Sequence, residues 1–324
     1  MSYYLGLDAG GTKTYAVIVD ETGRVAGRGR SGLGNHQTNR PRAEQNIRLA
    51  VDLALQDAQL QKVDIDFAYF GLAGADREPD FTILRPIIAG LGFSKYEIAC
   101  DTIIAMRAGT SRPFGVVVIC GTGTNCSGMN RQGESYQCGG FSYMFGDYGG
   151  GWVLAVEAFR SVIREWDGRG RPTLLTKLVL QRLGYSTTEA MFHDFLDHGK
   201  RVPSDLAELL FEASAQGDEV ALDLLRYQGE ELGRSVQAVV RRLRLEQEEL
   251  DVVLAGSVLT RGQGDYVIRH IAGMAVESAP RSHVRKLDCE PLVGALLLAM
   301  ERDDRSIEPD IQQRLKQIQM EPRE

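Results

Sequence analysis

Three glycine-rich turns, each directly after an apolar run, constrain the fold of this chain more than any other feature. Their sequences are Asp8-Ala9-Gly10-Gly11-Thr12-Lys13-Thr14, Gly121-Thr122-Gly123-Thr124-Asn125 and Ala255-Gly256-Ser257. Glycine lets a backbone approach a phosphate closely, and threonine and serine hydroxyls add hydrogen-bond donors. Two such turns can hold phosphates and the third a nucleoside, so the pattern predicts a nucleotide site built from separate parts of the chain.

Two widespread nucleotide-binding motifs do not fit these turns. The sequence has no G-x-x-x-x-G-K-[ST] string, and the stretch from Gly121 to Gly128 lacks the third glycine spacing of a dinucleotide-binding turn. The P-loop and the Rossmann turn are therefore both excluded.

The composition is that of an ordinary soluble protein. Of the 324 residues, 43% are hydrophobic and 25% are charged, and this length suffices for two domains. The formal net charge is -7, and the arginines of residues 241–244 are followed at once by glutamates. Because no sustained basic field results, we expect no nucleic-acid partner.

Compartment and metal content follow from what the sequence lacks. It has no basic and apolar leader and no apolar run of about 18 residues, so we expect a cytoplasmic protein that does not enter a membrane. The five cysteines form no C-x-x-C pair, which predicts reduced thiols. The five histidines show no ligand spacing, so a protein-built transition-metal site is not expected.

Hydrophobic patterning predicts an α/β protein whose first unit opens with a hairpin over residues 3–30. The further elements expected in this unit are a helix at 42–59, a strand at 67–72, a helix at about 79–91, a strand at 96–100 and a helix after Asp101.

The pattern restarts after a break at residues 112–115. A strand at 116–120 leads into the second glycine turn, and helices dominate residues 152–247. A strand at 251–254 then leads into the third glycine turn, and an apolar helix is expected at 291–300. Because strand, glycine turn, polar strand and helices recur, two related domains that face each other are predicted. The polar segment 303–324 is expected to be a surface helix or a frayed tail.

Further motifs occur in a specific order together with the glycine turns: Gly34-Asn35-His36, Cys100-Asp101, Cys138-Gly139-Gly140-Phe141, Gly146-Asp147-Tyr148-Gly149, and Gly217-Asp218 with residues 229–234. With them, nearly the whole chain resembles the N-acetylglucosamine kinase branch of the BadF/BadG/BcrA/BcrD ATPase family, in the actin/hexokinase/Hsp70 superfamily. The resemblance implies two ribonuclease H-like (actin-like ATPase) domains with an active-site cleft between them. The N-terminal domain would comprise residues 1–112 and about 303–324, and the C-terminal domain residues 113–302.

The resemblance also implies ATP-dependent phosphorylation of the 6-hydroxyl group of an amino sugar. Asp101 follows an expected strand and opens an expected helix, in the position of the catalytic base of the resembling kinases. There it would orient the sugar hydroxyl and accept its proton. A helix N-terminus favours the carboxylate form, so we expect Asp101 to be ionised at neutral pH. The alternative role is that of a helix N-cap.

ATP and Mg²⁺ are the cofactors that the resemblance implies. Asp8 would meet hydrated Mg²⁺ at the ATP phosphates, through water rather than directly, because this hard cation prefers carboxylate and water oxygens. The alternative is a turn aspartate that bonds its own backbone, and Lys13 could likewise be a solvated lysine. The implied ATP-binding residues are Gly10, Gly11, Thr12, Lys13, Thr122 and Gly123 for the phosphates, and Ser214, Gly233, Gly256 and Ser257 on the adenosine side.

For the sugar, the resemblance carries over Asn35, Thr124, Asn125, Gly140 and Asp147, with Asp101 at the acceptor hydroxyl. Carboxylates accept hydrogen bonds from sugar hydroxyls, and amides both donate and accept. Asp147 could instead cap a helix that begins near Trp152, and Asn35 could be an ordinary turn residue. Animal members carry a Trp shortly after the Asn, whereas His36-Gln37-Thr38 follows here, which leaves the exact sugar open. Cys138 is expected to be a packed thiol, since this reaction needs no nucleophilic cysteine.

Three hypotheses follow. The first is a kinase for N-acetylglucosamine, with N-acetylmuramic acid or glucosamine as other acceptors and a homodimer as the state that suits the family. The second is an ATPase that activates an acyl-CoA dehydratase through a cysteine-bound iron-sulfur cluster, for which Cys120, Cys126 and Cys138 are poorly placed. The third is a sugar sensor without catalysis, which would be expected to lack the base that Asp101 supplies.

Overall fold

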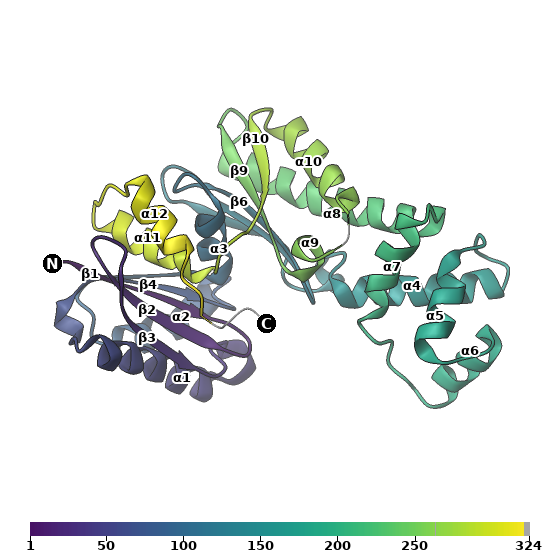
Figure 1. The fold of residues 1–324 in the computed structure, drawn as a ribbon, viewed down its shortest axis with the longest axis horizontal. Helices are drawn as coiled ribbons and strands as arrows, with labels where there is room; N and C mark the ends of the chain where they lie inside the picture. Colours follow the sequence, from purple (N-terminus) through teal and green to yellow (C-terminus); the bar gives the residue numbers. More distant parts are fainter. Residues whose placement is uncertain (263, 321–324) are drawn as a thin grey trace.

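The computed structural model describes residues 1–262 and 264–320, and these form two five-stranded mixed sheets with helices around and between them (Figure 1). The strand order is β3-β2-β1-β4-β5 in the first sheet and β10-β9-β6-β7-β8 in the second. The predicted α/β class and the two related units are therefore confirmed.

The first sheet contains the predicted hairpin and two parallel strands. Its strands are β1 (Tyr3–Ala9), β2 (Thr14–Asp20), β3 (Val25–Ser31), β4 (Ile65–Leu72) and β5 (Tyr96–Cys100). β1 pairs with β2 in antiparallel and with β4 in parallel orientation, and β5 continues the parallel part. The carboxyl ends of β1, β4 and β5 therefore meet at one edge of the sheet.

The second sheet repeats this arrangement. Its strands are β6 (Gly115–Cys120), β7 (Thr124–Met129), β8 (Ser135–Cys138), β9 (Leu250–Ala255) and β10 (Ser282–Lys286). β6 pairs with β7 in antiparallel and with β9 in parallel orientation. β6 thus takes the place of β1, and the second glycine turn takes the place of the first, although the sequence shows no strict repeat.

Two helices cover the outer face of the first sheet: α1 (His36–Ala58) and α2 (Glu78–Ala89). α1 packs closely on β3, because a side chain at Gly29 would meet the Ala50 carbonyl oxygen at 1.9 Å. The backbone of α1 is interrupted at Asn39, whose side chain accepts a hydrogen bond from Arg42 N–H at 3.1 Å. The continuous helix therefore begins close to residue 42, where the apolar spacing predicts it.

Helices α3 (Asp101–Gly109) and α11 (Leu292–Arg302) lie between the two sheets (Figure 1). They share one buried cluster that takes Tyr4 and Tyr69 from the first sheet and Val117 and Val253 from the second. α11 packs on α3, β1 and β4, and α12 (Pro309–Lys316), in the segment expected to be a surface helix or tail, packs on α11. We therefore propose that the C-terminal part of the first unit begins near residue 291, whereas the sequence placed its start at about 303.

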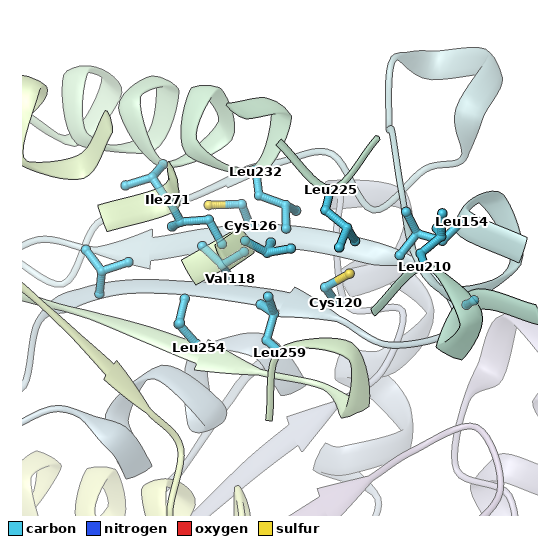
Figure 2. Close-up of a cluster of buried hydrophobic side chains, with 14 of the residues drawn as sticks. Val118, Cys120, Cys126, Leu154, Leu210, Leu225, Leu232, Leu254, Leu259 and Ile271 are labelled. Carbon is cyan, nitrogen blue, oxygen red and sulfur yellow. The ribbon is translucent and has the colours of Figure 1, made fainter. Parts of the chain in front are cut away.

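The remaining helices belong to the second unit: α4 (Gly151–Trp166), α5 (Leu174–Leu183), α6 (Thr188–Asp197), α7 (Leu206–Ala215), α8 (Glu219–Leu243), α9 (Ser257–Thr260) and α10 (Tyr266–Ser278). α8 begins at Asp218, whose side chain accepts a hydrogen bond from Ala221 N–H at 2.8 Å. Its apolar side, with Leu225 and Leu232, packs on the second sheet, and Cys120 and Cys126 are buried in the same cluster (Figure 2).

Candidate active site

The first glycine turn joins β1 to β2 at the edge where the parallel strands end. Gly10 N–H donates to the Lys13 carbonyl and Gly34 N–H donates to the Gly10 carbonyl, both at 2.9 Å, so backbone hydrogen bonds hold the turn. Gly11 and Thr12 are exposed, and a side chain at Gly11 would meet open space. The turn therefore presents backbone groups and a hydroxyl to solvent.

An acidic cluster lies at the same edge. It comprises Asp8 at the end of β1, Asp76 in the loop after β4, and Asp101 at the start of α3. The Sγ atom of Cys100, the last residue of β5, lies 3.2 Å from Oδ1 of Asp76 and 3.2 Å from Oδ1 of Asp101. One thiol therefore links two carboxyl groups. The sequence analysis did not single out Asp76, although the residue lies in the short loop that follows β4, four positions after its last residue, Leu72.

Burial raises the pKa values of two members of this cluster, Asp8 and Asp101. The pKa of Asp8 rises to about 7, mainly through burial and further through the charges of Asp101 and Glu290. Burial also raises the pKa of Asp101, where the hydrogen bond from Cys100 opposes the shift and the charge of Asp76 adds to it. The helix N-terminus alone predicts a stabilised carboxylate at Asp101, and burial outweighs that effect.

The alternative roles of these aspartates do not match the backbone. The N-cap of α3 is Cys100, and Asp101 is the first residue inside the helix. The alternative of Asp101 as a helix N-cap is therefore wrong. Asp8 pairs with Tyr15 in the β1–β2 ladder. Asp8 is thus a strand residue and not a residue of the turn itself.

The second glycine turn joins β6 to β7 and abuts the start of α4. Gly121 N–H donates to the Gly123 carbonyl at 2.9 Å, and Gly151 N–H donates to the Gly121 carbonyl at 2.7 Å. Gly150 has a φ of +80°, and a side chain there would meet the Thr122 carbonyl oxygen at 2.5 Å. This fit requires glycine and holds the N-terminus of the 16-residue helix α4 beside the turn, where anions bind favourably.

Asp147 organises the loop that follows β8. Its carboxylate accepts hydrogen bonds from the backbone N–H groups of Gly140, Phe141 and Ser142 at 3.1, 2.7 and 2.6 Å. The N-cap of α4 is Gly150, so the alternative of Asp147 as the cap of that helix is wrong.

The structure places three of the expected sugar-binding residues together. Thr124, Asn125 and Asp147 line one small pocket, into which Cys138 also faces. A side chain at Gly140 would come within 2.6 Å of Nδ2 of Asn125, so Gly140 adjoins the same group. Oδ1 of Asn125 is buried and has no hydrogen-bond partner among the described residues. Burial raises the pKa of the Cys138 thiol, which fits a packed side chain rather than a nucleophile.

Asn35 belongs to the first unit and caps α1. Its Oδ1 accepts a hydrogen bond from Gln37 N–H at 2.8 Å and would lie 3.0 Å from a side chain at Gly74. His36 is buried with Nε2 3.3 Å from Oδ1 of Asp80, and Gln37 donates to the Gly74 carbonyl at 3.1 Å. The residues after Asn35 therefore tie the start of α1 to the loop that carries Asp76.

A cavity of about 380 Å³ lies between the second glycine turn, α7 and α9. Thr122 and Ser257 line it, together with Trp152 and Phe211, which the sequence analysis did not assign. An aromatic residue directly after the glycines that open a helix is a signal that could have suggested Trp152.

Three of the four expected adenosine-side residues, Ser214, Gly233 and Gly256, do not line this cavity. Gly233 lies in α8, where a side chain would meet Sδ of Met274 in α10 at 2.7 Å, so this glycine serves helix packing. Ser214 donates its hydroxyl to the Phe211 carbonyl at 2.9 Å within α7. Gly256 has a φ of +86° and packs against the Cys120 carbonyl. It directly precedes Ser257, which does line the cavity.

The pattern of the BadF/BadG/BcrA/BcrD ATPase family matches residues 5–299. The chain belongs to this family. Two curated relatives of this chain are kinases of amino sugars. N-acetyl-D-glucosamine kinase of Dictyostelium discoideum is 30% identical over 314 residues, which cover 92% of this chain and 97% of that protein. N-acetylmuramic acid/N-acetylglucosamine kinase of Clostridium acetobutylicum is 27% identical, with 94% of this chain and 100% of that protein covered.

The fold of this chain is similar to that of a solved sugar kinase. The ROK hexokinase of Thermus thermophilus matches with a TM-score of 0.58 at 16% identity, covering 94% of this chain and 100% of that one. This likeness confirms the predicted fold class of two actin-like domains. Among the described residues, no helix combines the length and the apolar character that spanning a bilayer requires.

Proposed function

We propose that this chain is an ATP-dependent kinase that phosphorylates the 6-hydroxyl group of an amino sugar. N-acetylglucosamine is the first candidate, and N-acetylmuramic acid and glucosamine are the others. The observation that carries the proposal is the division of the site. The first unit contributes the partly buried Asp101 carboxyl group, and the second contributes an exposed glycine turn at a helix N-terminus. The amino-sugar kinases among the curated relatives support the choice of acceptor.

Asp101 would act as the base. The sugar oxygen attacks the γ-phosphorus of ATP, the bond from this phosphorus to the β,γ-bridging oxygen breaks, and the hydroxyl proton passes to the Asp101 carboxylate. Phosphoryl transfer depends mostly on positioning and charge stabilisation, so the base orients the hydroxyl before it accepts the proton. The raised pKa of Asp101 makes its carboxylate a better acceptor for that proton.

The second unit would hold the nucleotide. The backbone of Thr122 and Gly123 and the N-terminus of α4 would bind the phosphates through N–H donors, with Gly10, Gly11, Thr12 and Lys13 opposite. The adenosine would occupy the cavity of about 380 Å³ beside Ser257 and Phe211. Ser214 and Gly233 are left out of this proposal, because neither lines the cavity. Gly256 does not line it either, but it would hold Ser257, the next residue, at the cavity.

Asp8 fits a magnesium ion bound through water. A carboxyl group whose pKa is raised by burial and by two neighbouring carboxylates gains when a cation approaches. Mg²⁺ would neutralise negative charge on the ATP phosphates. Asp8 would orient the water molecules of that ion.

The acceptor sugar would lie between Asn35 and Asp101 of the first unit and Thr124, Asn125, Gly140 and Asp147 of the second. Because both units contact the sugar, its binding would draw them together and exclude water from the γ-phosphate. The dehydratase-activator alternative gains no support from the cysteines. Cys120 and Cys126 are buried among aliphatic side chains of the second unit (Figure 2), away from any surface that two subunits could share.

The test is a coupled ADP-release assay with MgATP and N-acetylglucosamine, N-acetylmuramic acid, glucosamine and glucose, with a control that lacks sugar. We expect turnover that depends on an amino sugar and a product whose phosphorus NMR signal couples to the C6 protons. Hydrolysis of ATP that is the same with every sugar and without sugar contradicts the proposal. Sedimentation of the same preparation tests the proposed homodimer, and fractionation of the source cells tests the proposed cytoplasmic location.

A further inference from the structure

A cavity of about 140 Å³ lies between the two units, next to the candidate acceptor site. Its first wall comes from the ends of β4 and β5 and from α3, with Asp76 and Cys100. Its second wall comes from the β7–β8 hairpin, with Ser127 and Gln137. None of the roles assigned above uses Asp76, Ser127 or Gln137.

The cavity adjoins the proposed acceptor residues on both walls. On the first wall, the Cys100 thiol lies 3.2 Å from the carboxyl oxygens of both Asp76 and Asp101. On the second wall, Nε2 of Gln137 donates to the Gly139 carbonyl at 3.0 Å and lies 2.9 Å from the position of a side chain at Gly140. A ligand that contacts Asp101 and Gly140 would therefore lie beside this cavity.

Ser127 supplies an independent sign of a ligand. Its side chain is 2% exposed, and its hydroxyl has no hydrogen-bond partner among the described residues, yet it lines the cavity. A buried hydroxyl without a partner destabilises a folded protein by about 1–3 kcal/mol. A hydrogen bond from a bound polar molecule removes that penalty.

We propose that this cavity is the part of the acceptor site that binds the sugar substituents remote from the 6-hydroxyl, and that Asp76 makes it select against a carboxylate on the sugar. This inference rests on the proposed kinase function. Ser127 and Gln137 bind hydroxyl or acetamido groups. Asp76 accepts hydrogen bonds from a hydroxyl, an amide N–H or an ammonium group.

The charges around the cavity support this selectivity. Asp76 and Glu97 are its charged lining residues, and none of the described residues that line it is Lys, Arg or His. The charge of Glu97 is compensated by Arg302, whose Nε lies 2.5 Å from Oε2 of Glu97. Asp76 is therefore the carboxylate that faces the ligand. A lactyl carboxylate, as in N-acetylmuramic acid, would be repelled here. N-acetylglucosamine and glucosamine, which carry no carboxylate, are therefore the preferred class of acceptor.

The first experiment substitutes Ser127→Ala. Because no described residue bonds to this hydroxyl, we expect a melting temperature at or above that of the wild type. With the sugar contact removed, KM for N-acetylglucosamine rises about 3- to 10-fold while KM for ATP is unchanged. An unchanged sugar KM together with the unchanged or higher melting temperature means that the cavity holds water only, and overturns the inference.

The second experiment compares kcat/KM for N-acetylglucosamine and N-acetylmuramic acid. For the wild type, we expect kcat/KM to be at least about tenfold higher with N-acetylglucosamine than with N-acetylmuramic acid. In Asp76→Asn, which lacks the repulsive charge, this ratio of the two kcat/KM values should be at least about threefold smaller. Any effect of the substitution on the base Asp101 changes kcat/KM for both sugars alike, so it does not change their ratio. Asp66→Asn is the matched control, because Asp66 lies at the opposite end of β4 and accepts a hydrogen bond from Tyr3 N–H.

The outcomes separate this inference from the function on which it rests. Turnover of an amino sugar by the wild type, with an N-acetylglucosamine preference that Asp76→Asn leaves unchanged, overturns the role of Asp76 and retains the kinase. A wild type that prefers N-acetylmuramic acid also overturns it. Absence of turnover with every amino sugar overturns the kinase proposal itself.

Discussion

The two units share a strand order but differ in the chemistry at the matching edge of each sheet. At the edge of the first sheet stand the carboxyl groups of Asp8, Asp76 and Asp101. At the matching edge of the second sheet stand the hydroxyl groups of Thr122 and Ser257, beside the N-terminus of α4. A repeated topology thus presents an acidic edge and an edge of neutral donors, suited to a cation and a proton on one side and to phosphates on the other.

The largest effect is expected for a substitution at the acidic edge of the first sheet. Asp101→Asn should lower kcat about 10²- to 10⁴-fold, because the amide cannot accept the hydroxyl proton, while KM for ATP stays within about twofold. Steady-state kinetics with MgATP and N-acetylglucosamine measure both values. Asp66→Asn at the far end of β4 is the control and should retain wild-type turnover. An Asp101→Asn enzyme with wild-type kcat would contradict the proposed base.

The next effect concerns the neutral edge. At Gly150, Ala would have to adopt a φ of +80° and would meet the carbonyl of Thr122, so Gly150→Ala should displace the second glycine turn from α4. We expect KM for ATP to rise at least about tenfold. Gly168→Ala is the matched control, since Gly168 has a φ of +81° but open space around it. It should lower stability through backbone strain and leave KM for ATP unchanged. Equal ATP affinities in both variants would show that the contact with Thr122 has no role.

A smaller effect sharpens the assignment of the adenosine cavity. Phe211 lines the cavity, whereas Ser214 bonds within α7 one turn further on. Phe211→Ala should raise KM for ATP about 3- to 10-fold, because an apolar wall beside the base is lost. Ser214→Ala should change it less than about twofold. The reverse order would return Ser214, the residue expected from the sequence, to the site.

The smallest effect is on stability, and it tests the charge imbalance of the acidic edge. The pKa of Asp8 is about 7 in the folded protein and 3.8 ordinarily, so the folded state retains a proton that the unfolded chain releases. This stabilising contribution is fully present below about pH 4 and is lost as the pH rises through about 7. In protein treated with EDTA, Asp8→Asn should therefore raise the melting temperature at neutral pH by about 2–4 °C and flatten its decline between about pH 4 and 7.

Asp20 offers a control of opposite sign. Burial disfavours its ionisation, but hydrogen bonds from Thr22 and Arg24 outweigh burial and lower its pKa. Its contribution to stability is present above its ordinary pKa and is lost as the pH falls through the lowered value. Asp20→Asn should accordingly lower the melting temperature at neutral pH. A lower melting temperature for Asp8→Asn as well would show that Asp8 is not an electrostatic liability in the metal-free protein.

The elements of the fold were largely predictable, because their signals are local. The hairpin over residues 3–30 has apolar runs at 3–7 and 15–19 on either side of a glycine turn, and the strand at 116–120 is a continuous apolar run. The placement of α11 was not predictable. Its apolar residues show that it is buried but not which sheet it packs on. Contacts with β1 and β4, such as that of Leu296 with Gly6, place it on the first sheet.

Within the candidate site, residues next to a glycine signal were easier to find than residues defined by distant contacts. Thr124, Asn125 and Asp147 follow glycine motifs, and the structure brings them into one pocket. Asp76 belongs to the candidate site because it contacts the Cys100 thiol, 24 positions away in sequence. Phe211 belongs to it because α7 brings this residue to the cavity beside the second glycine turn. Gly233 sits in a conspicuous motif, yet its role is to admit Met274.

The position of α11 has a consequence for the order in which the protein is made. The inner face of the first sheet is covered by residues 292–302. β1 can therefore be buried only after a helix about 290 positions later in the chain has been synthesised. The sheet of the second unit packs on α8 with one face and on α3 with the other, so the helices that cover it come from residues 101–286 and not from the end of the chain. During synthesis, the second unit can therefore complete its core first, while the unit that leaves the ribosome first stays open and exposed to aggregation until the last segment appears.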